Sequence, residues 1–102
     1  MIMRIWRGQA TAGNADAYVR HFSHTVSASL KTMAGHKAAW LLRHETDGRT
    51  EFLALTLWES RTAVEAFTGP DIDRAIVEPD ARAVLSDFDD FARHYEVAFA
   101  AP

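Results

Sequence analysis

Alternating apolar positions mark a pair of neighbouring strands near the middle of this chain. The segment 50–58 repeats with a period of two, the spacing of side chains along a strand, and it is apolar on both faces. The preceding segment, 36–45, shows the same alternation. Between the two, the Asp47-Gly48 pair favours a tight turn. The pattern therefore predicts an antiparallel hairpin.

A long helix is predicted before this hairpin. Asn14 suits its N-cap, and Gly35 suits the left-handed position beyond its last turn. Apolar residues recur three or four positions apart along one stripe, as on the buried side of a helix: Tyr18, Phe22, Val26, Leu30 and Met33. These signals bound a helix of about five turns.

Glycine, proline and capping residues bound the remaining elements. They are a strand over 2–7 that ends at Gly8, a helix capped by Ser60 that ends before Gly69, a further helical turn over 72–77, a helix over 79–85 and a final strand over 91–99. The predicted order is therefore strand, helix, strand, strand, helical segments, strand.

The strand 50–58 lacks the polar row that a half-exposed sheet would carry. Trp58 lies on one face, while the opposite face carries three leucines: Leu53, Leu55 and Leu57. An antiparallel sheet with water on one side usually alternates apolar and polar residues. Because the predicted helices can cover only one face, we expect a second copy of the chain to cover the other. The expected homodimer buries on the order of 2,000 Å² or more.

Composition narrows the classes of partner and chemistry. With 102 residues, 48% of them hydrophobic, we expect one domain over 1–102. The net charge of -3 and the scattered basic residues argue against nucleic acid, and no apolar run reaches the roughly 18 residues of a membrane span. The start of the chain lacks the pattern of a signal peptide, so we expect a cytoplasmic protein. The absence of cysteine excludes thiolate catalysis and cysteine-bound metals.

Aromatic residues are the main chemical resource that remains. The candidates for an aromatic slot that binds a flat apolar molecule are Trp6, Phe22, Trp40, Trp58 and Phe67. The same residues could equally form an ordinary core, and the sequence does not separate the two interpretations. No glycine-rich phosphate loop follows the first strand, so a nucleotide cofactor has no visible cradle.

Among the histidines, His94 is the candidate for catalysis. It alternates with Glu96 on the final strand, where it could accept a proton or simply pair across the dimer as a polar edge residue. His21 and His24 are three residues apart on the long helix, but no carboxylate supports them, so we expect no metal site. We take His94 as the proton acceptor and Trp58 as the wall of the pocket.

Several stretches of the sequence carry a family resemblance that covers nearly all of the chain. They are Trp6-Arg7-Gly8, Phe52-Leu53-Ala54-Leu55-Thr56-Leu57-Trp58-Glu59-Ser60, Ala63-Val64-Glu65-Ala66-Phe67 and His94-Tyr95-Glu96-Val97. With them, the chain resembles the antibiotic biosynthesis monooxygenase family of the dimeric α+β barrel superfamily. The resemblance implies an α+β fold of the ferredoxin-like βαββαβ type with an antiparallel sheet. It also implies a face-to-face dimer and a pocket between helices and sheet.

The resemblance also implies two kinds of chemistry. Some members of this family oxidise aromatic polyketides without metal or flavin, using the substrate's own electron-rich anion to meet oxygen, and others degrade haem. The Asn, Trp and His of the haem-degrading members fall on Trp6, Phe67 and Val77, so we expect no productive haem site and no cofactor. An Asn and a Tyr of the polyketide oxygenases fall on Ala54 and Val64, and only Trp58 matches.

The sequence thus favours a cofactor-independent monooxygenase acting on an aromatic or polyketide-like small molecule. Two alternatives remain open, a dimeric small-molecule-binding protein of the same fold without catalysis and an isomerase or cyclase that uses the same pocket. A polar group directed into the cavity would favour an enzyme, whereas an entirely apolar cavity would favour a binding protein.

Overall fold

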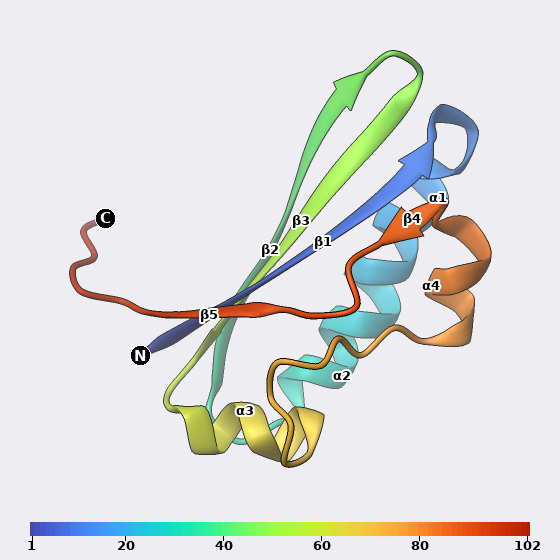
Figure 1. Ribbon diagram of the computed structural model, residues 1–102. Coiled ribbons are helices and arrows are strands. Elements are labelled where there is room, and N and C mark those ends of the chain that lie inside the picture. Colours follow the sequence, from blue (N-terminus) through green and yellow to red (C-terminus); the bar gives the residue numbers. More distant parts are fainter.

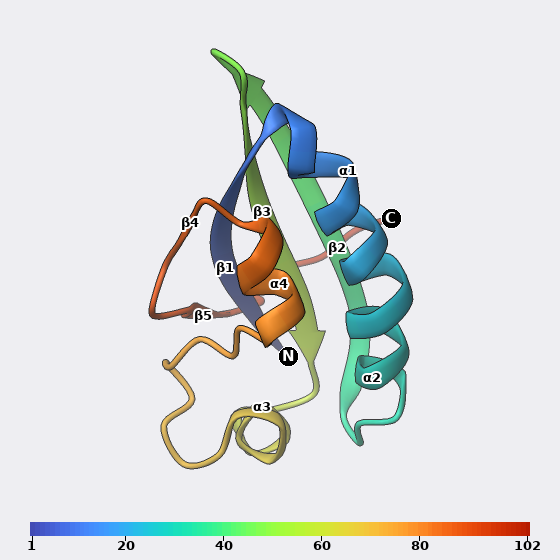
Figure 2. The same ribbon diagram turned by 90° about the vertical axis from the view of Figure 1, so that its right-hand side faces the viewer.

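The computed structural model describes residues 1–102, in which an antiparallel sheet carries all the helices on one face (Figures 1 and 2). The strands are β1 (Ile2–Thr11), β2 (His36–Thr46), β3 (Arg49–Trp58), β4 (Asp87–Phe88) and β5 (Arg93–Glu96). The helices are α1 (Ala12–Arg20), the π-helical segment η1 (His21–Val26), α2 (Ser27–Lys31), α3 (Arg61–Thr68) and α4 (Pro79–Val84). No helix is both long and apolar enough to cross a membrane.

The order of strands confirms the ferredoxin-like α+β fold. The sheet runs β2-β3-β1-β4, and β5 also pairs with β1, so β4 and β5 share the place of one edge strand. All pairings are antiparallel. The predicted hairpin between β2 and β3 is confirmed, because Asp47 and Gly48 both have positive φ, as its tight turn requires.

The first strand is longer than predicted. Gly8 does not end β1 but pairs with Phe52, and the strand continues to Thr11. A Cβ at Gly8 would lie 3.0 Å from the indole of Trp6, so glycine makes room for that ring beside the strand. The long helix consequently begins at Ala12 rather than after Asn14.

Other element boundaries also differ from the prediction. Residues 72–77 form no helix, and the final strand covers only Arg93–Glu96, preceded by the short strand β4. By contrast, Ser60 caps α3 as predicted, since its side chain accepts a hydrogen bond from the Ala63 amide, and Gly35 has the predicted positive φ. The π-helical turns of η1 carry no sequence signal that we recognise.

The core lies between the sheet and the helices. Tyr18 and Phe22 from the first helix pack with Phe52 on β3, while Leu30 packs with Trp58 in a second cluster. The predicted helical stripe is therefore the buried side of the helix. On β3, every second residue from Thr50 to Trp58 is buried, as the alternation required.

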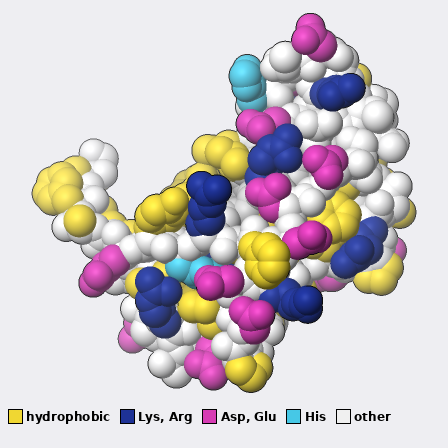
Figure 3. All heavy atoms as spheres, viewed as in Figure 1, with side chains coloured by type: hydrophobic (Ala, Val, Ile, Leu, Met, Phe, Trp, Pro, Cys, Tyr) yellow, Lys and Arg dark blue, Asp and Glu magenta, His cyan; other side chains and the backbone are white.

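The opposite face of the sheet carries no helix (Figure 1). We call this surface the open face and define it by Met3, Ile5, Trp40, Leu42, Leu53, Leu55, Leu57 and Tyr95. Hydrophobic side chains reach the surface along the side of the hairpin that faces the C-terminal segment (Figure 3). The row of leucines on β3 thus lies outside the core of one chain, as the sequence predicted.

Candidate functional site

A cavity of about 80 Å³ lies between the first helix and the covered face of the sheet. Ten of its 15 lining residues are hydrophobic. Its aromatic walls are Trp6, Tyr18, Phe22 and Phe67, and its polar lining is Arg4, His21, Ser29, Thr56 and Glu78. The predicted pocket between helices and sheet therefore exists and contains a charged group.

Strand register places the floor of the cavity. Arg4 is opposite Thr56 and Trp6 is opposite Ala54, so all four side chains lie on the covered face. Ala54 is small and leaves space above the sheet that a larger residue would fill. The π-helical segment adds His21 and Phe22 from above, in keeping with the frequent use of such segments at functional sites.

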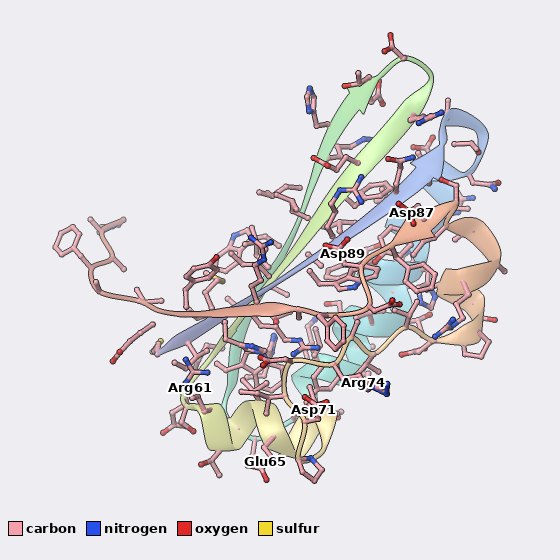
Figure 4. The ribbon with its side chains drawn as sticks, in the orientation of Figure 1. Arg61, Glu65, Asp71, Arg74, Asp87 and Asp89 are labelled. Carbon is pink, nitrogen blue, oxygen red and sulfur yellow. The ribbon has the colours of Figure 1, made fainter.

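Arg4 lines the cavity and is buried, with only 5% of its surface exposed. Its Nη1 donates to the carbonyl of Ile72, and its Nη2 donates to the carbonyl of Arg74 at 3.0 Å. Both carbonyls belong to the connection between α3 and α4, which Asp71 and Arg74 mark in Figure 4. Arg4 therefore fastens this connection to the sheet.

His94 lies on β5 directly opposite Arg4. Nη1 of Arg4 is 2.9 Å from Nε2 of His94, and Nδ1 of His94 is 3.1 Å from Oδ1 of Asp73. Because a guanidinium can only donate hydrogen bonds, Nε2 accepts and Nδ1 carries the proton that is donated to Asp73. His94 is thus neutral, and its basic nitrogen is already occupied by Arg4.

Burial and mutual repulsion lower the pKa values of this pair. Burial lowers the pKa of Arg4 to about 10, against a smaller opposing effect of Asp73. Burial, together with the positive charge of Arg4, lowers the pKa of His94 below its ordinary value, although Asp73 acts in the opposite direction. Arg4 remains charged at neutral pH, while His94 remains neutral.

Three of the predicted site residues meet in the cavity, and three do not line it. Trp6, Phe22 and Phe67 form aromatic walls, as proposed. Trp58 lies one layer deeper, where it is fully buried and stacks on Phe67 at 5.5 Å between ring centroids. His94 lies behind Arg4, with its side chain 2% exposed.

Trp40 is on the open face, opposite Leu55, and is 45% exposed. Its neighbours on β2 at positions 39 and 41 face the helices, so the alternation along the strand directs Trp40 away from the cavity. The structure therefore separates Trp40 from the aromatic slot and places it among the apolar residues of the sheet's other side.

The sequence analysis missed the polar groups of the cavity. Arg4 sits within an apolar strand, where its alternation with Ile2 and Trp6 was the available signal for an inward position. His21 is three residues beyond Tyr18 on the helix, so both face the same side. Burial raises the pKa of Tyr18 above its ordinary value, and the Tyr18 hydroxyl makes no hydrogen bond within the chain.

We expect the folded protein to lose stability on acidification through His94. Since its pKa is lower in the folded state than in the unfolded chain, the unfolded chain binds a proton first as the pH falls below about 6.5. The free energy of unfolding should therefore fall between that pH and the folded-state pKa. The variant His94→Gln, which can still accept from Arg4 and donate to Asp73, should show a weaker fall in urea titrations across this range.

The exposed His24 offers a matched control, because His24→Gln removes a histidine that makes no hydrogen bond. His36, whose pKa burial also lowers, contributes in the same direction and remains in both variants. Equal pH dependence of stability in His94→Gln and the unaltered protein would contradict the assignment.

Comparison with known proteins places the chain and its fold in a family. The family model described as antibiotic biosynthesis monooxygenase matches residues 1–79, and the chain belongs to this family. No curated protein matches the chain in sequence.

Several solved structures share the fold at low identity. The haem degrader MhuD from Mycobacterium tuberculosis, with two haems bound in its active site, is 21% identical over 100% of both chains, with a TM-score of 0.67. SnoaB, a cofactor-independent oxygenase from Streptomyces nogalater, is 17% identical over 99% of this chain and 96% of its own, with a TM-score of 0.68. The monooxygenase ActVA-Orf6 from Streptomyces coelicolor, in complex with nanaomycin D, is 14% identical over 99% and 90%, with a TM-score of 0.64.

The residues at the three positions named for haem degradation do not suit haem. Trp6, Phe67 and Val77 all line the cavity, which supports the gapless placement of these positions, but none of them can bind iron. The volume of about 80 Å³ is also well below the roughly 300 Å³ at which pockets for larger ligands begin. At these three positions, therefore, the cavity offers no side chain that binds haem iron.

Proposed function

We propose that this protein is a cofactor-independent monooxygenase whose substrate places an aromatic ring in the cavity. The observation that supports this proposal is a buried guanidinium inside an aromatic-walled cavity. A protein that only stored an apolar molecule would need apolar walls alone. A buried charge beside the ligand suits a reaction that proceeds through a charged form of the substrate.

The proposed reaction needs no group beyond the substrate and oxygen. A ring-activated CH₂ group loses a proton, and its anion gives electrons to O₂. One oxygen atom stays in the substrate as a carbonyl and the other leaves as water, so R₂CH₂ and O₂ become R₂CO and H₂O. The cavity supports this chemistry by excluding water from the anion and by holding the ring against Trp6, Phe22 and Phe67.

Two titratable residues of the cavity lining, His21 and Glu78, are the candidates for the proton acceptor. His94, the residue named for this role, has its basic nitrogen bonded to Arg4 and does not line the cavity. His21 and Glu78 do line it, and each can accept a proton from a ring seated there. We therefore propose that His94 positions Arg4, while proton transfer passes through His21 or Glu78.

The size of the cavity limits what enters it. An engineered cavity of about 150 Å³ holds one benzene molecule, so about 80 Å³ accepts a single ring only in part or after a small adjustment of the walls. Ile76, which is 46% exposed, and Glu78 lie where the lining reaches the surface. We propose that the reacting ring enters and that any further rings rest beside these two residues.

Oxygen uptake with a panel of phenols, naphthols and hydroxyanthrones tests the function. With chelator present and flavin absent, we expect uptake with at least one panel member and transfer of one atom of ¹⁸O₂ into the product. Ser29→Phe should reduce the rate by about tenfold or more, because the new ring occupies the cavity, whereas Ala28→Phe, on an exposed neighbouring position, should not.

Two results would defeat the proposal. One is tight binding of panel members without any oxygen uptake, which would favour the binding protein. The other is conversion of a substrate without oxygen consumption, which would favour the isomerase or cyclase.

We also propose that the protein is a homodimer joined through the open face. The supporting observation is an apolar centre of the open face, where Leu55 lies between Ile5 and Trp40, next to a polar end with the Arg7–Glu51 ion pair. Surfaces of this kind on small proteins mark interaction sites. The test of this proposal is the oligomeric state of the protein in solution.

A further inference from the structure

Arg4 is a buried cation that has no carboxylate partner in the chain. Arg4 is 5% exposed, yet none of the six ion pairs within 4.0 Å involves it. Asp73, the acidic residue that acts on it, is reached only through His94 and has a side chain that is 68% exposed. Buried charges are normally paired, because an unpaired one costs several kcal/mol in desolvation.

The guanidinium also keeps hydrogen-bonding capacity. Of its five N–H groups, three are used, by the carbonyls of Ile72 and Arg74 and by His94. The Nε–H group and the second N–H on Nη2 have no partner in the chain. Arg4 and Phe67 both line the cavity, and the guanidinium lies 5.8 Å from the Phe67 ring, so its positive charge acts on a molecule seated against that wall.

We propose that Arg4 is the anion receptor of the cavity and binds the oxygen of an aromatic ligand in its phenolate or enolate form. This inference rests on the proposed function in so far as it uses the same cavity, and it names the residue that binds the anion of the substrate. The aromatic walls hold the ring, and the guanidinium supplies the opposite charge. A ligand anion replaces the carboxylate that the chain does not provide.

The charged groups around Arg4 do not neutralise its positive charge. His94 is neutral and Asp73 lies beyond it, screened by solvent, so neither cancels the charge directly. Arg61 acts on His94 from α3 and adds positive charge. On the cavity side, Glu78 and His21 are the titratable groups, and Phe67 lies 5.8 Å from the guanidinium in a cation–π arrangement.

His94 and Asp73 act as positioning residues in this arrangement. His94 accepts from Nη1 and so fixes the plane of the guanidinium, while the two carbonyls hold its far edge. The bond from Nδ1 of His94 to Asp73 keeps the required tautomer. The edge that carries Nε is thereby left for the ligand.

Binding of 4-nitrophenol tests the receptor without oxygen chemistry, because its phenolate is yellow and its phenol is not. We expect the bound ligand to ionise at a pH about one unit lower than free 4-nitrophenol, which corresponds to about tenfold tighter binding of the phenolate than of the phenol. The methylated analogue 4-nitroanisole has the same ring but no ionisable oxygen, and it should bind about tenfold more weakly than the phenolate.

Arg4→Gln should abolish the preference, because an apolar cavity without a cation favours the neutral phenol. The pKa of the bound ligand should then rise above that of the free compound, while 4-nitroanisole should bind within about threefold of the unaltered protein. Arg4→Lys, which keeps the charge but not the planar fork, should retain the lowered pKa of the ligand. If Arg4→Gln does not fold, two measurements still test the receptor. They are the relative affinities of the unaltered protein for 4-nitrophenolate and 4-nitroanisole, and the pKa of 4-nitrophenol bound to Arg4→Lys.

Several outcomes would overturn the inference. They are an unchanged or raised pKa of the ligand in the unaltered protein, equal affinity for 4-nitroanisole, no binding of any probe, or binding that survives Ser29→Phe in the cavity. Tighter binding of 4-nitrobenzoate than of the phenolate would assign the site to carboxylates instead. Phenolate binding without oxygen uptake would defeat only the proposed oxygenase, and uptake that is unaffected by Arg4→Gln would defeat only the receptor.

Discussion

Replacing Trp58 by alanine should lower the free energy of unfolding by about 3 to 5 kcal/mol, the range for large-to-small changes of buried aromatic residues. Trp58 is fully buried, stacks on Phe67 and meets the edge of His36 at 5.1 Å. Its Nε1 donates to the hydroxyl of Thr56 at 2.9 Å. Alanine would therefore leave a cavity and remove the partner of a buried hydroxyl.

Urea titration of Trp58→Ala and Trp58→Phe measures this effect. Because small domains unfold at a cost of only about 5 to 15 kcal/mol, the alanine variant should be near its stability limit. The phenylalanine variant keeps a ring against Phe67 and should lose less. A loss below about 1 kcal/mol in Trp58→Ala would show that this side chain does not support the core.

Trp58 also connects stability to ligand binding. Phe67 and Thr56 both line the cavity, and both contact Trp58 from the cavity side. We expect Trp58→Phe to weaken 4-nitroanisole binding less than Phe67→Ala does, because the first change acts only through its neighbours. Trp58 does not line the cavity itself but stacks on Phe67, which does, and its part in ligand binding stays a prediction.

The elements of this fold that depend on local chemistry could be predicted from the sequence. The hairpin turn needs two residues that tolerate positive φ, and Asp47-Gly48 supplies them. Ser60 offers a hydroxyl to the first free amides of α3. The period of two along β3 distinguished the buried face, with Trp58, from the open face, with Leu55.

The parts that depend on contacts distant in sequence could not be predicted in this way. Residues 72–77 have helical composition, but the carbonyls of Ile72 and Arg74 bond to Arg4, and the Ala75 amide bonds to the carbonyl of Asp90. These bonds draw the segment along the sheet instead of around a helix axis. The contact between Arg4 and His94 is of the same kind, because it joins residues 90 positions apart in the sequence.

The candidate site was predicted in its class and only partly in its residues. The aromatic residues of the sequence indicated either an apolar slot or an ordinary core, with equal weight. Whether an aromatic residue lines the cavity depends on how deeply it is buried. Phe67 lines the cavity, whereas the fully buried Trp58 lies behind it. The buried position of Arg4 could not be predicted, because a single arginine in an apolar strand normally projects into water.

Placing a charge at the centre of the open face should separate the proposed homodimer. Leu55 lies between Ile5 and Trp40 on neighbouring strands, and a twofold axis would bring each substitution into the interface twice. Each buried, unpaired carboxylate of Leu55→Asp should cost about 2 kcal/mol or more, so the dissociation constant should rise by about a thousandfold or more. Light scattering coupled to size exclusion should then show half the mass of the unaltered protein.

Ala28→Asp introduces the same charge at an exposed position of α2 and should leave the dimer intact. In the proposed dimer each chain is stabilised by its partner, so we expect the urea midpoint of the unaltered protein to rise with protein concentration. The midpoint of a monomeric Leu55→Asp should not rise. A stable, folded monomer of the unaltered protein at micromolar concentration would contradict the proposed dimer. So would an unchanged mass for Leu55→Asp, since a charge at this position is incompatible with an apolar sheet packed against its copy.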